Sequence, residues 1–187
     1  MLFLTKGRVF RARQKRTATV LASLFGANHM TEGEEKLYKR LYISLEDFRH
    51  AFGCTSFIFK KGWHFSPWEK RGSIYLQQSA FTAWLIISYS RPFTHSKGLP
   101  DFPRRLLSYD DADKSMHEKI LSFRHQIYAH SDAIQYEINP VRIAGQASAV
   151  VRAPFFKLTA EETKQLQEMI KKAMTAIQSE LQRLMPS

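Results

Sequence analysis

Side chains able to hold phosphate and to move protons gather in one short stretch of the sequence, FRHQIYAHSD, residues 123–132. An arginine presents a planar fork of donors that matches phosphate oxygens, and an imidazole exchanges a proton near neutral pH. A surface that combines these groups can hold a phosphate and move protons. The side chains concerned are Arg124, His125, Tyr128, His130 and Asp132.

A helix over about residues 111–131, capped by Asp110 or Asp111, is predicted to position most of these groups. Its apolar residues recur at helical spacing, and they are Met116, Ile120, Phe123 and Ile127. Arg124 then lies about 80° to one side of the buried stripe and His130 about 40° to the other. His117, Arg124 and Tyr128 form a second row beside that stripe.

Two helices are predicted earlier in the chain. Residues 31–59 form a long first helix with Thr31 as N-cap and acidic residues in its first turn. Residues 73–91 form a second helix that is apolar nearly all round, so we expect it to be central. It stops before Pro92, since the residue ahead of a proline avoids the helical conformation. Between the two helices, we expect two tryptophans to fold back onto the core, Trp63 and Trp68.

The last part of the chain changes character twice. Residues 134–156 contain alternating apolar residues and strand formers, which predict a β-hairpin or another extended insertion. Residues 158–185 then form a final helix with Thr159 as N-cap and Glu162 completing a capping box. The expected fold is mainly α: a four-helix up-down bundle with this insertion between its third and fourth helices.

Composition limits the class of protein. The chain has 187 residues, of which 44% are hydrophobic and 24% charged, as in an ordinary globular domain. The longest apolar run, residues 83–87, is too short to span a bilayer, so no membrane association is expected. Cys54 is the single cysteine, which excludes an internal disulfide and a cysteine-based zinc site and favours a reducing cytoplasm.

The formal net charge of +11 favours a polyanionic partner. Much of this charge comes from residues 1–29, which contain six basic residues and no acidic one. This basic leader is interpreted as a translation start assigned too early, a disordered RNA-binding arm or a transit-type segment, and we favour the first. Residues 30–187 are expected to form the single folded domain.

The run from Arg124 through His125 to His130 resembles the Arg, polar residue, then His signature of the HEPN superfamily. "YAHSD", "MHEKILSFR" and "SYSRPF" are also similar to segments of HEPN families linked to toxin and abortive-infection systems. The resemblance covers about residues 31–185. It implies a helical bundle, RNA as substrate, metal-independent ribonuclease activity without a cofactor, and a composite site in a homodimer.

The resemblance also implies roles for particular residues. Arg124 stabilises the charged phosphorane and His130 carries the proton; a second copy of the chain supplies the other proton carrier. His125 orients Arg124 or contacts RNA, and Asp132 orients His130. The remaining supporting or RNA-binding residues are Tyr128, His117, Glu118 and Arg91.

The presence of each of these residues can also be explained without a catalytic or binding role. His130 suits the C-terminal end of any helix dipole, and Arg124 can pair with Glu118 or Asp132. Arg91 can simply end its helix. His117 and Glu118 lack a second ligand at i+4, so we expect no metal.

Three hypotheses remain open on the sequence alone. The first is a HEPN endoribonuclease, acting as a toxin or antiphage effector that an antitoxin or another inhibitory protein restrains. The alternative is a HEPN-type module that binds RNA, a nucleotide or a protein without catalysis. The third is an unrelated helical bundle with no site.

Overall fold

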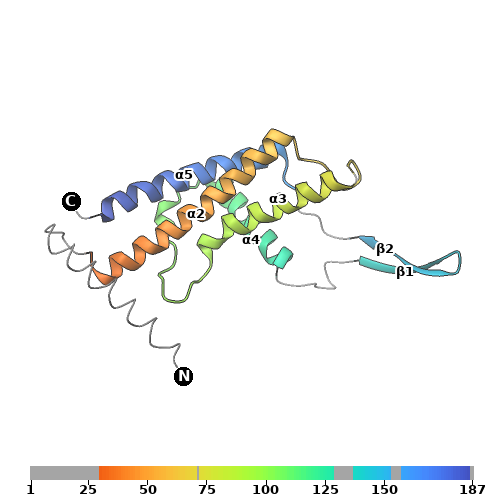
Figure 1. The fold of residues 1–187 in the computed structure, drawn as a ribbon, viewed down its shortest axis with the longest axis horizontal. Coiled ribbons are helices and arrows are strands. Elements are labelled where there is room, and N and C mark those ends of the chain that lie inside the picture. The colour runs from red at the N-terminus through yellow and green to blue at the C-terminus, as the bar shows by residue number, and fades with distance from the viewer. Residues whose placement is uncertain (1–29, 71, 129–136, 153–156, 186–187) are drawn as a thin grey trace, which may run out of the picture.

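The computed structural model describes residues 30–70, 72–128, 137–152 and 157–185. Within these ranges the protein is mainly helical, with a small antiparallel hairpin before the last helix (Figure 1). The helices are α2 (Glu32–Lys61), α3 (Ser73–Ser90), α4 (Asp111–Tyr128) and α5 (Ala160–Leu184), and two short 3-10 turns, η1 (Arg91–Phe93) and η2 (Arg104–Leu106), lie between α3 and α4. The basic leader, residues 1–29, lies outside the described residues.

The two longest helices begin at the predicted caps. Thr31 accepts a hydrogen bond from the backbone N–H of Glu34, whose side chain accepts one back from the Thr31 backbone N–H. Thr159 and Glu162 form the same reciprocal pair at the start of α5. Each capping box satisfies donors that the first turn of a helix leaves unpaired, so both predicted starts are confirmed.

Helix α2 lies between α3 and α5 (Figure 1). It runs antiparallel to α5: Thr55, late in α2, bonds Gln167, early in α5. Helix α4 packs against both α3 and α5, and Lys119 of α4 reaches Glu162 of α5. The core consists of the apolar faces of these helices and includes Phe48, Leu85, Ile120 and Ile170, which are all fully buried.

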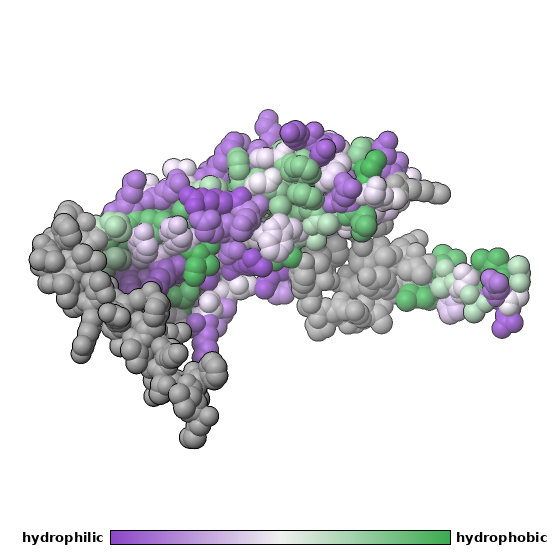
Figure 2. Space-filling model, viewed as in Figure 1, coloured by the Kyte–Doolittle hydropathy of each residue, from purple (hydrophilic) through white to green (hydrophobic). Residues whose placement is uncertain are grey.

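Helix α3 is less enclosed than predicted. Its apolar residues occupy nearly the whole circumference, but the neighbouring helices cover only one side of it. Ile74, Leu76 and Trp84 therefore stay 43%, 70% and 41% exposed. Figure 2 shows hydrophobic side chains at the surface of the helical part of the molecule. The expectation of a central second helix is wrong, because α2 holds that place.

The two tryptophans after α2 behave differently from each other. Gly62 ends α2 in the left-handed conformation, with φ +62°, and the Trp63 N–H returns to the Ile58 carbonyl at 3.0 Å. This turn folds Trp63 onto the rings of Phe57 and Phe81. Trp68, which follows a proline turn, is 66% exposed, so the expectation that it packs on the core is wrong.

The predicted insertion contains a β-hairpin, β1 (Glu137–Ile143) and β2 (Gln146–Arg152). Ile143 pairs with Gln146, and the two turn residues, Ala144 and Gly145, both have positive φ. A tight turn of this kind matches the right-handed twist of paired strands. The hairpin extends away from the helices (Figure 1). None of the described helices is long and apolar enough to cross a membrane.

Candidate functional site

Helix α4 carries the predicted site residues that fall within the described range, except Arg91, which begins η1. Asp110 caps this helix by accepting a 2.8 Å hydrogen bond from the Asp113 N–H, and Met116 and Ile120 are buried on its predicted stripe. Near its other end, Arg124 is half-buried and His125 is exposed.

Part of the predicted catalytic stretch cannot be placed. Tyr128 is the last described residue of α4, and only its backbone is described. His130 and Asp132 lie outside the described residues. Among the residues that are described, no acidic side chain forms an ion pair with Arg124, and Glu118 stays exposed. The predicted pair between Arg124 and Glu118 is therefore not formed.

His117 lies inside a ring cluster. Its Nδ1 is 3.0 Å from the Tyr89 hydroxyl, which is also 3.1 Å from the Tyr109 hydroxyl. The Phe93 ring packs edge-on against the imidazole, with centroids 4.5 Å apart. Burial, assisted by the positive charge of Arg104, lowers the pKa of His117 below 6.5. His117 is thus a neutral, packed imidazole at neutral pH.

The two tyrosine hydroxyls in this cluster stay protonated near neutral pH. Burial raises the pKa of Tyr109 to about 12 and that of Tyr89 well above its usual 10. A hydroxyl that stays protonated serves as a fixed donor and acceptor, and does not exchange its proton near neutral pH. The cluster orients side chains in the interior; it does not supply a general acid or base.

The predicted row from His117 to Arg124 begins in this ring cluster, because His117 is packed against Tyr89 and Phe93. Seven residues separate His117 from Arg124 along α4, which is about 10 Å of helix. Arg91, which follows α3, makes its contacts elsewhere. Its guanidinium sits 3.4 Å from Asp47 Oδ1 and 4.9 Å from the centre of the Trp84 ring.

Asp47, in the middle of α2, holds Arg91, which follows the last residue of α3. Burial raises the pKa of Asp47, while the hydrogen bond and charge of Arg91 act in the opposite direction. Ring stacking and this half-buried partner fix the guanidinium at the end of α3. The interpretation of Arg91 as a residue that ends its helix matches this position better than a contact with the predicted catalytic residues does.

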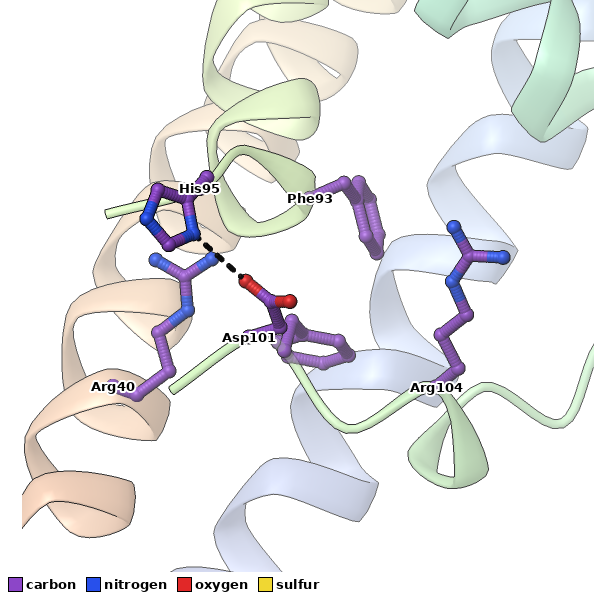
Figure 3. A pocket seen from close by; sticks show the side chains of 6 residues that line it. Arg40, Phe93, His95, Asp101 and Arg104 are labelled. Atoms are coloured by element: carbon purple, nitrogen blue, oxygen red, sulfur yellow. Dashed lines mark hydrogen bonds and ion pairs between the residues drawn. The ribbon is translucent and has the colours of Figure 1, made fainter. Parts of the chain in front are cut away.

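A pocket that the sequence did not predict lies beside the N-terminal half of α2. Its volume is about 230 Å³. Figure 3 shows its lining, in which Phe93 lies between Arg40 on one side and Arg104 on the other. The residues that line it are Arg40, Phe93, His95, Asp101, Phe102 and Arg104.

Arg40 is the unusual member of this lining, because its side chain is only 4% exposed. Its Nη2 donates to the backbone carbonyls of Pro92 and Thr94, at 2.5 and 2.8 Å. Its Nε has no hydrogen-bond partner among the described residues. Burial lowers the pKa of Arg40, against the opposing charges of Asp101 and Asp47.

Sequence reasoning missed Arg40, although a signal was present. Arg40 lies four residues before Ser44 and eight before Phe48, both buried on α2, so it is in phase with the buried face of the helix. An arginine at such a position needs internal acceptors. The loop that supplies them, residues 91–94, comes from a distant part of the chain.

No group of three or more potential metal ligands occurs among the described residues. No protein-family model matches the chain, and neither a curated protein nor a solved structure matches it.

Proposed function

We propose that this chain is a metal-independent endoribonuclease of the HEPN type, active as a homodimer in the cytoplasm. Its helices would form the up-down bundle expected of that superfamily, with the hairpin as an insertion before the closing helix. Arg124 and His130 would carry the reaction, and neither a metal nor another cofactor would take part.

One observation supports the proposal more than any other: Arg124 is half-exposed near the end of α4 and pairs with no described acidic residue. A guanidinium that merely stabilises a helix surface usually finds a carboxylate nearby, whereas one that binds substrate keeps its donors available. The hairpin and α5 follow in the expected order. The surplus of basic residues also favours an anionic substrate.

The proposed reaction is an attack of the ribose 2′-oxygen on the adjacent phosphorus. His130 takes the 2′-hydroxyl proton, and the partner's copy of the same imidazole protonates the departing 5′-oxygen. Arg124 binds the phosphorane oxygens as their charge increases. The products are a 2′,3′-cyclic phosphate and a 5′-hydroxyl end.

The other residues have smaller roles in this proposal. His125 and Tyr128 contact RNA or orient Arg124, and Asp132 orients His130. His117 and Arg91 make no contact with substrate in this proposal, since His117 is packed against Tyr89 and Arg91 is paired with Asp47 of α2.

Incubation of the purified full-length protein with labelled RNA in EDTA tests the proposal. We expect cleavage with cyclic phosphate ends, and a loss of about 100-fold or more in Arg124→Ala and His130→Ala. Lys114→Ala is the matched control, because it removes an exposed cation from the first turn of the same helix and should leave cleavage unchanged. Circular dichroism and native mass must stay as in the wild type.

The outcomes separate the proposal from its alternative. Undiminished cleavage by both active-site variants rejects the assigned residues. Saturable RNA binding that Arg124→Ala weakens, without cleavage by the wild type, favours a non-catalytic binding module. If cleavage occurs, growth arrest on expression and its relief by a co-expressed neighbour would identify a toxin with its antitoxin.

A further inference from the structure

We propose that the pocket lined by Arg40, His95 and Arg104 binds a phosphate-sized oxyanion. The site is separate from the catalytic residues proposed above. Its ligand would be either free inorganic phosphate or the terminal phosphate of a nucleotide. The pocket is lined by a buried cation that forms no ion pair with a described carboxylate and by a second, exposed cation, and its volume suits a small group.

The buried cation is Arg40. One of its nitrogens donates to two backbone carbonyls, and Nε is fully buried, with no partner in the described part of the chain. A buried charge is costly unless an opposite charge lies close to it. Arg40 forms no ion pair with a described carboxylate, although the charges of Asp101 and Asp47 act on it from further away. An oxyanion in the pocket would add a counter-charge beside this guanidinium.

The second cation is Arg104, on the short turn η2. It is exposed, and no described acidic residue forms an ion pair with it. Figure 3 shows it on the far side of Phe93 from Arg40. Guanidinium groups on two sides match the several oxygens of a phosphate, which accept hydrogen bonds in different directions.

Asp101 is the one lining residue that opposes an anion. Its carboxylate lies 3.4 Å from His95 Nδ1, and its side chain is 83% exposed. A carboxylate so exposed can turn into solvent when a ligand arrives, but its charge remains and weakens binding. Removal of this charge should therefore strengthen binding, a direction opposite to that of most substitutions in a site.

The size of the pocket limits the ligand. Sites for drug-sized molecules usually enclose about 300–1,000 Å³, and this pocket encloses about 230 Å³. It holds a group of a few heavy atoms, such as phosphate, and would leave the rest of a nucleotide outside. Phe93 and Phe102 close the space between the cations, and burial among rings strengthens the attraction of the remaining charges.

Isothermal titration calorimetry of the full-length protein at constant ionic strength tests this site. The probes are inorganic phosphate, adenosine monophosphate and, as the compound without a phosphate, adenosine. We expect saturable binding of at least one phosphate compound and none of adenosine. Equal affinity for both phosphate compounds indicates free phosphate, and a tighter monophosphate indicates a terminal phosphate.

Three variants locate the binding. Arg104→Ala should weaken it about tenfold or more, because it removes hydrogen bonds to a charged group. Asp101→Asn should strengthen it several-fold. Lys97→Ala is the charge-matched control, since this exposed lysine is close in sequence to His95 but outside the lining, and it should change binding little.

The site would be rejected by the absence of saturable binding for both phosphate compounds, by an Arg104→Ala variant that binds as well as the wild type, or by equal binding of adenosine. Arg124→Ala should bind phosphate normally, since Arg124 lies near the C-terminal end of α4 and is not among the residues that line the pocket. Failure of this proposal is thus distinguishable from failure of the proposed nuclease.

Discussion

Glu180 is a single carboxylate held between two arginines of different elements. Its Oε1 accepts hydrogen bonds from Arg183 at 2.8 Å and from Arg105 at 2.7 Å, and its Oε2 accepts a third from Arg183 at 2.9 Å. Its side chain is only 8% exposed. The bonds from Arg183, followed by that from Arg105, lower the pKa of Glu180 to about 2.

This pKa predicts a pH-dependent contribution to stability. Because the folded-state pKa is below the ordinary value of 4.5, the ionised carboxylate stabilises the fold above about pH 4.5. The contribution is lost as the pH falls through about 2. We expect Glu180→Gln to lower the free energy of unfolding by ~1–2 kcal/mol at pH 7, with the difference closing toward pH 2.

Urea unfolding of both proteins at a series of pH values measures this difference. Glu168→Gln is the control, since Glu168 pairs with Lys171 on an exposed surface and its side chain is 51% exposed; it should cost little at any pH. A difference for Glu180→Gln that stays constant from pH 7 to pH 2 would contradict the assignment.

At single residues, the sequence predicted the local contacts better than the distant ones. The caps Thr31 and Thr159 were predictable because their partners lie three residues away. Arg40 depends on carbonyls more than fifty residues along the chain, and a single sequence does not indicate such a pairing. The helical spacing places His117 in a row beside Arg124. Its hydrogen-bonded surroundings come from Tyr89 and Tyr109, which lie on other segments of the chain.

The helices and the hairpin were predictable for the same reason that they form. Each depends on a repeat of apolar residues and on turn signals contained within the element itself. How α3 packs was not predictable: its composition suits a fully enclosed helix, but the number of neighbours is set by the whole arrangement. The exposed faces of Leu76 and Trp84 follow from that arrangement.

The hairpin contributes little to the core. Ile138, Ile143 and Val150 are 56%, 62% and 60% exposed, and the strands extend away from the helices (Figure 1). An isolated two-stranded hairpin is at best marginally stable in water. The helices should therefore fold without it.

Replacement of residues 138–151 by Gly-Gly tests this independence. Glu137 and Arg152 are paired neighbours, so a short link can join them. We expect the free energy of unfolding to change by less than ~1 kcal/mol, because few apolar side chains leave a buried environment. Thr159→Ala, which removes the cap of α5 a few residues later, should cost ~1 kcal/mol by itself. Loss of helical structure on excision would show that the strands support the fold.

At the scale of the whole molecule, the proposed nuclease needs more than one chain. The reaction uses a proton acceptor and a proton donor, and each copy would supply one His130. Within one chain, His117 does not provide the second, because it is packed against Tyr89 and its pKa is lowered by burial. Two copies related by a dyad would bring equivalent residues together.

Mixing of subunits tests this requirement directly. Wild-type protein at a fixed concentration is equilibrated with increasing amounts of His130→Ala, and RNA cleavage is measured with substrate in excess over total protein. If both imidazoles act in one site, each mixed dimer loses an acid or a base. The rate should then fall in proportion to the share of wild-type chains found in homodimers.

Arg124→Ala should suppress the wild type in the same way, because the mixed site retains only one guanidinium for the phosphorane charge. A wild-type rate that excess variant leaves unchanged, although native mass shows mixed dimers, would mean that each chain cleaves alone. A native mass of one 21.8 kDa chain at all concentrations would remove the composite site altogether, since acid and base would then have to come from one copy.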